Sequence, residues 1–404
     1  MTPSRRPKST LLLESIHPSA RDMLAEHGQS VELVTSAYKE DELIAALEAV
    51  DIVGIRSKTR VTRRVLEASR LLAVGCFCIG TNQVDLAAAT KAGVPVFNAP
   101  FSNTRSVAEL ILAEVIALAR QLFDRSREVH EGTWKKVATR SYEVRGKTLG
   151  IVGYGHIGRQ IGVLAEMVGM RVVFFDVATR LPMGNNRSAA TMDEVLGEAD
   201  FVTLHVPETP QTKGLIGAAE LAKMKAGAYL LNASRGTVVD LHALAASLRA
   251  GHLAGAAVDV YPEEPESNGA GFETPLRGVP NVILTPHIGG STAEAQASIG
   301  REVATSLVKY VETGATTGAV NFPEVELPPS PGCSRVVNVH RNVPGVMRDI
   351  NRLVAARGAN IRAQILSTTA DIGYLVMDLD EDVSEGVADD LAGLDTSIRT
   401  RVLA

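Results

Sequence analysis

The stretch Gly153-Tyr154-Gly155-His156-Ile157-Gly158 lies between an apolar run at residues 148–152 and a helical pattern at residues 159–168. This order predicts a strand, a tight glycine turn and a helix. A second apolar run, residues 171–175, ends at Asp176, close to the spacing of about 20 residues at which a dinucleotide-binding fold places a carboxylate for the adenosine ribose.

Each glycine of the turn has its own task. The first permits the tight turn, the second lets the backbone approach a pyrophosphate, and the third lets the helix pack closely on the strand. The pyrophosphate would lie at the positive end of the new helix. The segment therefore predicts a dinucleotide site, and Asp176 favours NAD over NADP because its carboxylate repels a 2′-phosphate.

The composition limits the classes of partner. With 404 residues, the chain is long enough for two or three domains. It carries 41 basic and 46 acidic residues, a formal net charge of −5, and the basic residues are scattered. Neither nucleic acid nor a membrane is expected as a partner, because no basic stripe is present and no apolar run reaches the roughly 18 residues of a membrane span.

The first residues and the cysteines bear on the compartment. The apolar residues 10–13 are too few for a signal-peptide core, so we expect a cytoplasmic protein. Cys76 and Cys78 lie two apart in an apolar run, without a CxxC motif or further ligands nearby. We therefore expect no metal and interpret the pair as buried strand cysteines.

Alternating strand and helix patterns extend through the first 313 residues. Strand patterns occur at 10–13, 51–56, 71–78 and 95–98, then at 201–205, 229–232, 255–259 and 282–285, with helical patterns at 41–49 and 84–92. This spacing predicts α/β units with a doubly wound parallel sheet after the glycine turn. Ser106 and Glu109 form a Ser-x-x-Glu capping box that predicts the start of a long connecting helix. The helical pattern at 293–313 predicts a return to the first unit, so that the nucleotide-binding domain is an insertion.

The tail beyond residue 331 predicts a separate small domain. Four prolines between Pro323 and Pro331 indicate an extended linker. After it come a strand (335–340), a helix (345–357), two strands (360–369 and 373–379), a helix (384–391) and a strand (397–403). This β-α-β-β-α-β order is typical of a ferredoxin-like domain.

Three polar segments follow successive strand patterns of the nucleotide-binding region: residues 232–236, 259–265 and 285–290. In open α/β sheets, ligands bind beyond the carboxyl ends of the strands. Taken singly, Arg235, Glu264 and His287 fit a loop charge, a helix start and a buried histidine. Their joint placement predicts one site instead.

These residue types suit hydride transfer from an alcohol. His287 is the candidate base for the hydroxyl proton, since histidine titrates near neutral pH. Glu264, with Glu263 as the weaker alternative, would hold the histidine tautomer and stabilise the imidazolium. Arg235 would bind a substrate carboxylate through its planar guanidinium.

Long strings of the chain resemble the D-2-hydroxyacid dehydrogenases, and among them the members with a C-terminal ACT regulatory domain. The strings are residues 75–82, 98–109, the glycine turn, 234–240 and 286–292. The resemblance implies a Rossmann-type domain inserted in a flavodoxin-like substrate domain, followed by a ferredoxin-like ACT domain. The implied boundaries are 1–102 and 291–331 for the substrate domain and its linker, 103–290 for the NAD-binding domain, and 332–404 for the ACT domain.

The resemblance also implies ligand residues. It implies the catalytic trio Arg235, Glu264 and His287, and an NAD site formed by Gly153, Gly155, His156, Ile157, Gly158, Asp176, Ala233, Ser234, Arg235, Asp259, His287, Ile288, Gly289 and Gly290. For substrate it implies Arg56, Ser57, Lys58, Gly80 and Asn103, with Trp134 and Lys136 reaching a neighbouring subunit's site. A lone tryptophan after a long helix, however, is more often part of the core of its own chain. For an amino-acid effector the resemblance implies His340, Asn342 and Asn360. Val343 departs from the arginine of similar proteins.

The implied activity is NAD-dependent oxidation of 3-phospho-D-glycerate to 3-phosphohydroxypyruvate, the entry to serine synthesis. Inhibition by L-serine and a homotetramer are implied as well, with a dimer left open. One alternative is a reductase of other 2-oxo acids such as hydroxypyruvate, glyoxylate or 2-oxoglutarate. Another is an NAD-sensing scaffold of the same fold, and the tail could be a dimerisation module without a ligand.

Overall fold

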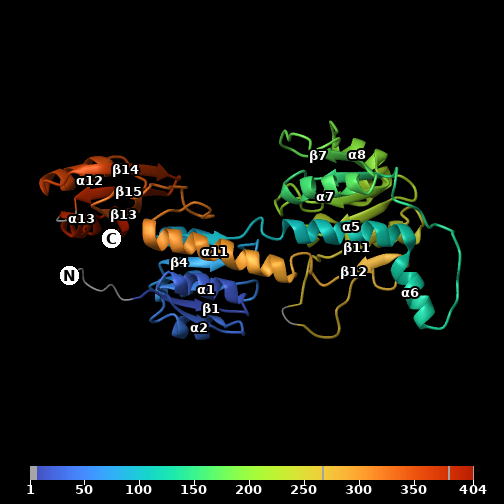
Figure 1. The fold of residues 1–404 in the computed structure, drawn as a ribbon, viewed down its shortest axis with the longest axis horizontal. Helices are drawn as coiled ribbons and strands as arrows, with labels where there is room; N and C mark the ends of the chain where they lie inside the picture. The colour runs from blue at the N-terminus through green and yellow to red at the C-terminus, as the bar shows by residue number, and fades with distance from the viewer. Residues whose placement is uncertain (1–6, 266–267, 381–382, 404) are drawn as a thin grey trace. The chain divides into compact units, whose positions relative to one another are not determined.

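A computed structural model describes residues 7–265, 268–380 and 383–403 of the chain. Contacts divide the chain into two compact units, one formed by residues 1–102 with 296–404 and the other by residues 103–295. The first unit is therefore discontinuous in sequence. Figure 1 shows both units as layers of helices over sheets.

The first unit contains a five-stranded parallel sheet of order β2-β1-β3-β4-β5. Its strands are β1 (Ser9–Leu12), β2 (Ser30–Leu33), β3 (Ile52–Ile55), β4 (Ala73–Cys76) and β5 (Val96–Asn98). The helices between them are α1 (Pro18–Glu26), α2 (Glu40–Ala46), α3 (Arg63–Ala68) and α4 (Leu86–Lys91), and α11 (Ala293–Thr313) returns the chain to this unit. The strand β2 was missed by the sequence pattern, because it is an edge strand with alternating polar residues.

The same unit holds a four-stranded antiparallel sheet of order β14-β15-β13-β16. Its elements are β13 (Cys333–Arg341), α12 (Val346–Ala356), β14 (Ile361–Thr368), β15 (Ile372–Asp380), α13 (Ser384–Ala392) and β16 (Ser397–Leu403). This order confirms the predicted ferredoxin-like arrangement. One face of the sheet packs on α12 and α13 through residues such as Val336 and Leu375.

The other face of the antiparallel sheet is buried against the rest of its unit. Val337 and Tyr374 share a core with residues of α11, and the Tyr374 hydroxyl donates to the carbonyl of Gly314 at 2.6 Å. The buried Arg335 pairs with Asp378, with Nε 2.6 Å from Oδ1. Arg335 also donates to carbonyls of the linker and of the end of α11. The small domain is therefore attached by an apolar core and by a polar clamp.

The second unit contains a seven-stranded parallel sheet of order β12-β11-β10-β9-β6-β7-β8. Its strands are β6 (Thr148–Val152), β7 (Arg171–Phe175), β8 (Arg187–Ser188), β9 (Phe201–Leu204), β10 (Tyr229–Asn232), β11 (Gly255–Val258) and β12 (Val282–Leu284). The helices are α5 (Thr104–Arg120), α6 (Leu122–His130), α7 (His156–Met167), α8 (Met192–Glu198), α9 (Ala218–Lys223), η1 (Gly236–Val238) and α10 (Leu241–Arg249). The order in which strands join the sheet reverses at β6. The strands β7 and β8 lie on one side of β6, and β9 to β12 lie on the other, as in doubly wound folds.

The capping box predicted at Ser106 and Glu109 is wrong. The helix α5 already begins at Thr104, with Asn103 at the N-cap. Ser106 lies in the first turns and shares a hydrogen bond of 2.7 Å with the hydroxyl of Thr292, while Glu109 pairs with Arg105. The Ser-x-x-Glu pattern is therefore used for contacts along the helix rather than at its start.

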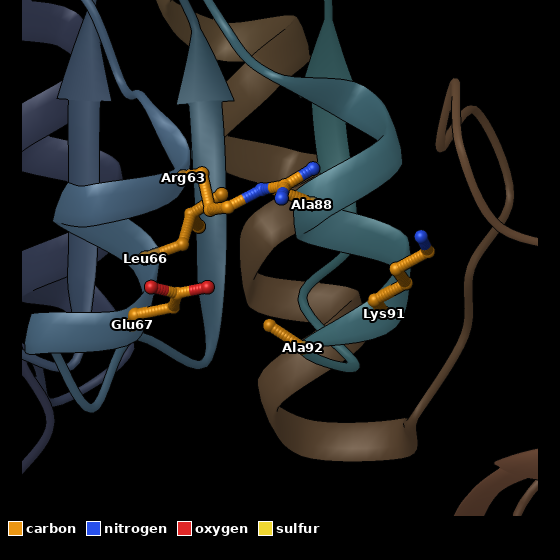
Figure 2. Close-up of a pocket in the computed structure, with 6 residues that line it drawn as sticks. All are labelled: Arg63, Leu66, Glu67, Ala88, Lys91 and Ala92. Carbon is orange, nitrogen blue, oxygen red and sulfur yellow. The ribbon is translucent and has the colours of Figure 1, made fainter.

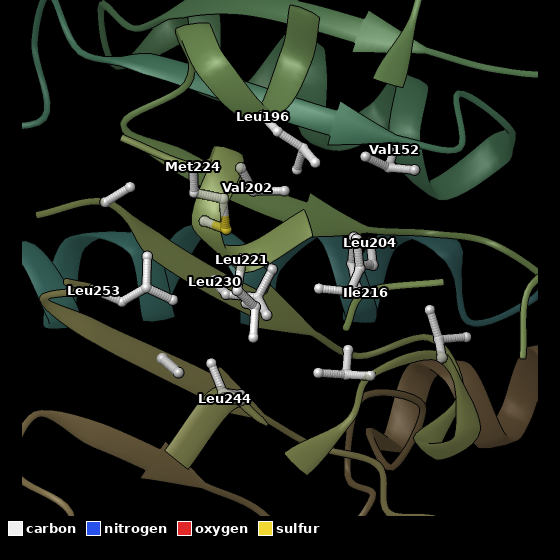
Figure 3. Packing of buried hydrophobic residues seen from close by; sticks show 14 of the residues in the cluster. Val152, Leu196, Val202, Leu204, Ile216, Leu221, Met224, Leu230, Leu244 and Leu253 are labelled. Atoms are coloured by element: carbon white, nitrogen blue, oxygen red, sulfur yellow. The ribbon is translucent and has the colours of Figure 1, made fainter. Parts of the chain in front are cut away.

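The core on one face of the second sheet is continuous and apolar. Figure 3 shows Val202, Leu204 and Leu230 of the central strands facing Leu196, Leu221 and Leu244 of the covering helices. Leu230 of β10 is 1% exposed. This packing fixes the strand whose carboxyl end leads into the polar segment at Arg235.

We expect Leu230→Ala to lower the free energy of unfolding of the second unit by about 2–5 kcal/mol, because it removes buried methyl groups and leaves a cavity. Denaturant titration followed by circular dichroism would measure the loss. Leu181→Ala is the matched control, because Leu181 is 81% exposed and its removal opens no cavity. Equal losses in the two variants would contradict the placement of Leu230.

Candidate active site

The glycine turn joins β6 to α7. Gly153 has a φ of 93°, and a Cβ there would lie 2.3 Å from the carbonyl oxygen of His205. A Cβ on Gly158 would lie 2.2 Å from the carbonyl oxygen of Gly153, whereas one on Gly155 would meet nothing within 4 Å. The outer glycines therefore permit close packing, and the middle one leaves open space at the N-terminus of α7. This geometry fits a dinucleotide pyrophosphate.

Asp176 follows β7 and is held against the glycine turn. Its carboxylate accepts from the backbone N–H of Tyr154 at 2.8 Å and of Ala178 at 2.9 Å. Arg180 Nε lies 3.5 Å from Oδ1 of the same carboxylate. The acidic residue is therefore oriented by the turn itself, at the place where the ribose of a dinucleotide would lie.

Tyr154, between the first two glycines, points into the protein. Its ring is fully buried and stacks on Phe174 with a centroid separation of 3.6 Å. The hydroxyl donates to Asn186 at 2.9 Å and accepts from the N–H of Met183 at 3.1 Å. Tyr154 therefore anchors the segment that follows Asp176, a role that the glycine pattern alone does not indicate.

The structure brings Arg235, Glu264 and His287 together in the second unit. His287 Nδ1 lies 2.8 Å from Glu264 Oε2, and the other oxygen of Glu264 accepts from the N–H of Tyr261 at 3.1 Å. Arg235 follows β10, and its charge acts on both members of the pair. A Cβ on the next residue, Gly236, would lie 1.9 Å from the backbone of Tyr261. This glycine lets the segments of Arg235 and Glu264 approach closely.

The pair shifts the protonation of both partners. The hydrogen bond that His287 donates to Glu264, outweighing burial, raises the pKa of His287 above its usual value. Burial pushes the pKa of Glu264 up, but the hydrogen bond and charge of His287 outweigh it, so that the carboxyl pKa is lowered. Arg235 opposes the rise in the histidine pKa. The arrangement stabilises a carboxylate beside an imidazolium, as in acid/base dyads.

Asp259 holds the loop that carries His287. Its carbonyl accepts from the N–H of His287 at 2.8 Å. Its carboxylate accepts from the Thr285 hydroxyl at 2.6 Å and from the N–H groups of Ile288 and Gly289, each at 2.8 Å. His287 itself has a φ of 54°, in the left-handed region. Asp259 is 1% exposed, so its carboxylate acts on the loop from within the protein.

Glu114 was not identified from the sequence as a residue of the candidate site. It lies on the buried face of α5, 4% exposed, and its Oε1 has no hydrogen-bond partner among the described residues. Burial and the negative charge of Asp259 raise the pKa of Glu114 to about 8. The available signal was an acidic residue within the apolar pattern of the long connecting helix predicted after the capping box.

The remaining predicted cofactor residues lie in the same unit. Ser234 is buried and donates to Asn232 Oδ1 through both its N–H, at 3.0 Å, and its hydroxyl, at 2.8 Å. A Cβ on Gly290 would lie 2.9 Å from Nδ2 of Asn103. His156 and Ile157 open α7, and Ala233 follows β10. The residues implied for NAD thus follow the strands β6, β7, β10, β11 and β12.

The predicted substrate residues are divided between the two units. Arg56, Ser57 and Lys58 follow β3, and Gly80 follows β4, in the first unit. Asn103, Trp134 and Lys136 belong to the second unit. Trp134 is 84% exposed, so it does not pack within its own chain. This corrects the reading of a lone tryptophan as core and leaves the proposed contact with a neighbouring subunit as a prediction.

The predicted effector residues lie in the antiparallel sheet and its loops. His340 in β13 is 3% exposed, and burial lowers its pKa. Its Nδ1 lies 3.0 Å from Asn338 Oδ1, while Asn338 Nδ2 donates to the hydroxyls of Ser397 and Thr400 at 2.9 and 2.8 Å. In this arrangement Nδ1 carries the proton and Nε2 is an acceptor.

The other two predicted effector residues are in loops. Asn342 donates to the carbonyl of Thr369 at 2.7 Å, and Asn360 is exposed just before β14. Val343 is 45% exposed. These three residues lie on the surface, whereas His340 is buried in the sheet.

A cavity of about 230 Å³ lies elsewhere in the first unit, between α3 and α4. Figure 2 shows the six residues that line it: Arg63, Leu66 and Glu67 of α3, with Ala88 and Lys91 of α4 and the following Ala92. It contains none of the predicted site residues. Across the described ranges, no group of three His, Cys, Asp or Glu side chains could hold a metal ion, and no helix has the length and apolar character to span a membrane.

Comparison with known proteins identifies the family of the chain. Residues 112–289 match the NAD-binding domain of the D-isomer specific 2-hydroxyacid dehydrogenases, and residues 338–399 match an ACT domain of the AHAS small-subunit type. The D-3-phosphoglycerate dehydrogenase of Dictyostelium discoideum is 54% identical over 394 residues, covering 97% of this chain and 96% of that protein. The Escherichia coli K12 protein of the same name is 49% identical over 397 residues and covers 97% of each.

A solved structure extends the comparison to the cofactor. The NAD-dependent formate dehydrogenase of Staphylococcus aureus, in complex with NAD, is 27% identical, with a TM-score of 0.64 over 75% of this chain and 95% of that chain. The dinucleotide-binding fold predicted from the glycine turn is thereby confirmed.

We expect Glu264→Gln to move the acid limb of the pH profile of alcohol oxidation to lower pH. The glutamine removes the main cause of the raised His287 pKa, so the histidine becomes an unprotonated base at lower pH. Steady-state kcat/KM between pH 5 and 9 would measure the shift. Glu263→Gln is the neighbouring control, and an unchanged acid limb in Glu264→Gln would contradict the pairing.

Proposed function

Because the chain belongs to the D-3-phosphoglycerate dehydrogenases, we propose that Arg235, Glu264 and His287 carry out its oxidation of 3-phospho-D-glycerate to 3-phosphohydroxypyruvate. The chain is an NAD-dependent oxidoreductase acting on a CH–OH group, at the first step of phosphorylated serine synthesis. The observation that supports the trio best is the 2.8 Å contact between His287 and Glu264 with Arg235 nearby.

Proton transfer is assigned to His287. With Nδ1 donating to Glu264, Nε2 is left as the acceptor for the proton of the substrate hydroxyl. The Glu264 carboxylate then stabilises the imidazolium that forms. Arg235 binds the substrate carboxylate and holds the reacting carbon in place.

The cofactor is assigned to the glycine turn. NAD, when bound, accepts the hydride released from the substrate carbon. The open space at Gly155 and the N-terminus of α7 would hold its pyrophosphate, and the oriented carboxylate of Asp176 would accept from its ribose hydroxyls. Reductases of other 2-oxo acids would use the same trio, so the choice of substrate must come from other residues.

We assign that choice to the first unit. Arg56, Ser57 and Lys58, with Gly80, are proposed to bind the phosphate or carboxylate of the substrate, because two cations and a hydroxyl suit an oxyanion. Residues 1–102 and 291–331 then form the substrate-binding domain, and residues 103–290 the NAD-binding domain. Asn103 is proposed as a further substrate ligand, and Trp134 and Lys136 as contacts to a neighbouring subunit's site.

Regulation is assigned to residues 332–404. The match to an ACT domain supports binding of a small-molecule effector here, and we propose that L-serine binds at His340, Asn342 and Asn360 where two copies of this domain meet. A homotetramer provides such pairs. We further propose a cytoplasmic location, supported by the low cysteine content of three in 404 residues.

Removing the positive charge of Arg56 or of Lys58, in the loop after β3, should weaken binding of the phosphorylated substrate selectively. We expect Arg56→Ala or Lys58→Ala to raise KM for 3-phosphohydroxypyruvate roughly ten- to hundredfold, the cost of one charge-assisted hydrogen bond. Reduction of hydroxypyruvate, which lacks the phosphate, is the comparison. Equal losses on both substrates would remove phosphate recognition from this loop.

Serine inhibition should depend on the polar loops of the ACT domain. We expect Asn342→Ala with Asn360→Ala to weaken L-serine binding by about tenfold or more in calorimetry, while leaving kcat without serine unchanged, because hydrogen bonds to the zwitterion are lost. Point variants are preferable to deletion, since removing residues 332–404 would expose the core around Tyr374. If millimolar serine neither binds nor inhibits the unmodified enzyme, the domain is not a serine sensor.

A further inference from the structure

A carboxylate from another strand holds the loop that follows β3. Glu14 lies just beyond β1 and is 7% exposed. Its Oε1 accepts from the N–H of Arg56 at 3.2 Å and of Thr59 at 2.8 Å, and its Oε2 accepts from the N–H of Lys58 at 2.9 Å. Backbone N–H bonds to a carboxylate are charge-assisted and strong. Glu14 therefore fixes three of the four amides of residues 56–59.

Gln83 holds the same loop from the carbonyl side. Its Nε2 donates to the carbonyl of Arg56 at 2.7 Å and to that of Gly80 at 3.2 Å, and its own carbonyl accepts from the N–H of Val61 at 2.8 Å. The backbone N–H of Arg56 thus bonds to the side chain of Glu14, and its backbone carbonyl bonds to the side chain of Gln83. The main chain of Arg56 is fixed whatever its own side chain does.

The turn that aims Glu14 at this loop is strained. Glu14 and Ser15 have φ angles of 61° and 53°, in the left-handed region that residues other than glycine rarely adopt. Their N–H groups donate to the carbonyls of Ser36 and Val34 at 3.1 and 3.2 Å, which maintains the turn. Such strain persists where the surroundings impose it and is concentrated at functional sites. The strain here serves to direct a carboxylate across the carboxyl ends of β1 and β3.

The groups left free on the loop are those that suit an anion. Of the amides of residues 56–59, only that of Ser57 has no acceptor within the described ranges. Ser57 and Lys58 are exposed, and Arg56 is half-buried with its guanidinium 3.4 Å from the carbonyl of Glu14. Because Glu14 occupies the other amides, residues 56–59 can bind an oxyanion only through the two cationic side chains, the Ser57 hydroxyl and the Ser57 N–H.

We propose that Glu14 is a positioning residue for the substrate, with Gln83 as its counterpart. Glu14 accepts hydrogen bonds from three backbone N–H groups of the loop. It thereby holds the side chains of Arg56, Ser57 and Lys58 in position for the anionic group of the substrate. The inference rests on the proposed assignment of this loop to substrate binding. It adds two residues, distant from one another in sequence, that would set substrate affinity without touching the substrate.

Glu14→Gln tests this with the intact enzyme. Glutamine keeps the shape but has one acceptor oxygen, and its NH2 group would face an amide N–H, so at least one of the three bonds is lost. We expect KM for 3-phosphohydroxypyruvate to rise about tenfold, with kcat and the dissociation constant of NAD within about twofold of the unmodified enzyme. Glu26→Gln, an exposed glutamate at the end of α1, is the matched control. A lower Tm with unchanged KM would show a purely structural role and overturn the proposal.

Gln83→Leu gives a second test that does not depend on how Glu14→Gln folds. It releases the carbonyl of Arg56, and we expect the same selective rise in KM; an unchanged KM in a folded Gln83→Leu enzyme would overturn the role of Gln83. Arg56→Ala distinguishes the positioning role of Glu14 from the assignment of the loop to substrate binding. If Arg56→Ala raises KM but Glu14→Gln does not, only the positioning role fails. If Arg56→Ala leaves KM unchanged, the assignment of the loop to substrate fails with it.

Discussion

The carboxylate of Asp259 is the constraint on which the candidate active site depends. It accepts three hydrogen bonds, from Thr285, Ile288 and Gly289. The backbone carbonyl of Asp259 accepts a fourth, from the N–H of His287. His287 occupies the left-handed region, which costs free energy unless the surrounding contacts impose it. The energy of the Asp259 contacts therefore maintains the loop in the one conformation that places the imidazole against Glu264.

A second buried carboxyl group, Glu114, interacts with Asp259. Glu114 lies near it in the core, and burial together with the charge of Asp259 raises the Glu114 pKa to about 8. At neutral pH Glu114 is therefore mostly protonated, whereas the carboxylate oxygens of Asp259 accept hydrogen bonds from three donors of the loop. The parallel sheet then completes the site, because β10, β11 and β12 are neighbours and their carboxyl ends deliver Arg235, Glu264 and His287 to one edge.

Residues with strict local spacing made the nucleotide site predictable from sequence. Gly153, Gly158 and Asp176 follow a pattern set by backbone geometry, and the trio follows strands with clear apolar runs. The strand β2 escaped prediction because half of its residues are polar, and the capping box at Ser106 failed because its hydroxyl has a tertiary partner, Thr292. The roles of Glu14, Asn338 and Asp259 could not be predicted either, since each depends on contacts between segments far apart in the chain.

The most direct test of the account is the pKa of His287 in the Asp259→Asn enzyme, measured by NMR titration of labelled histidine and assigned with a His287→Gln spectrum. An asparagine cannot accept from all three donors of the loop, so the imidazole should lose its fixed position against Glu264. The charge of Asp259 contributes to the raised pKa of His287, but less than the pairing with Glu264 does. We therefore expect a fall larger than the loss of that charge alone would give, bringing the pKa close to that of a free histidine although Glu264 is unchanged. A His287 pKa equal to that of the unmodified enzyme would contradict the claim that Asp259 presets the catalytic loop.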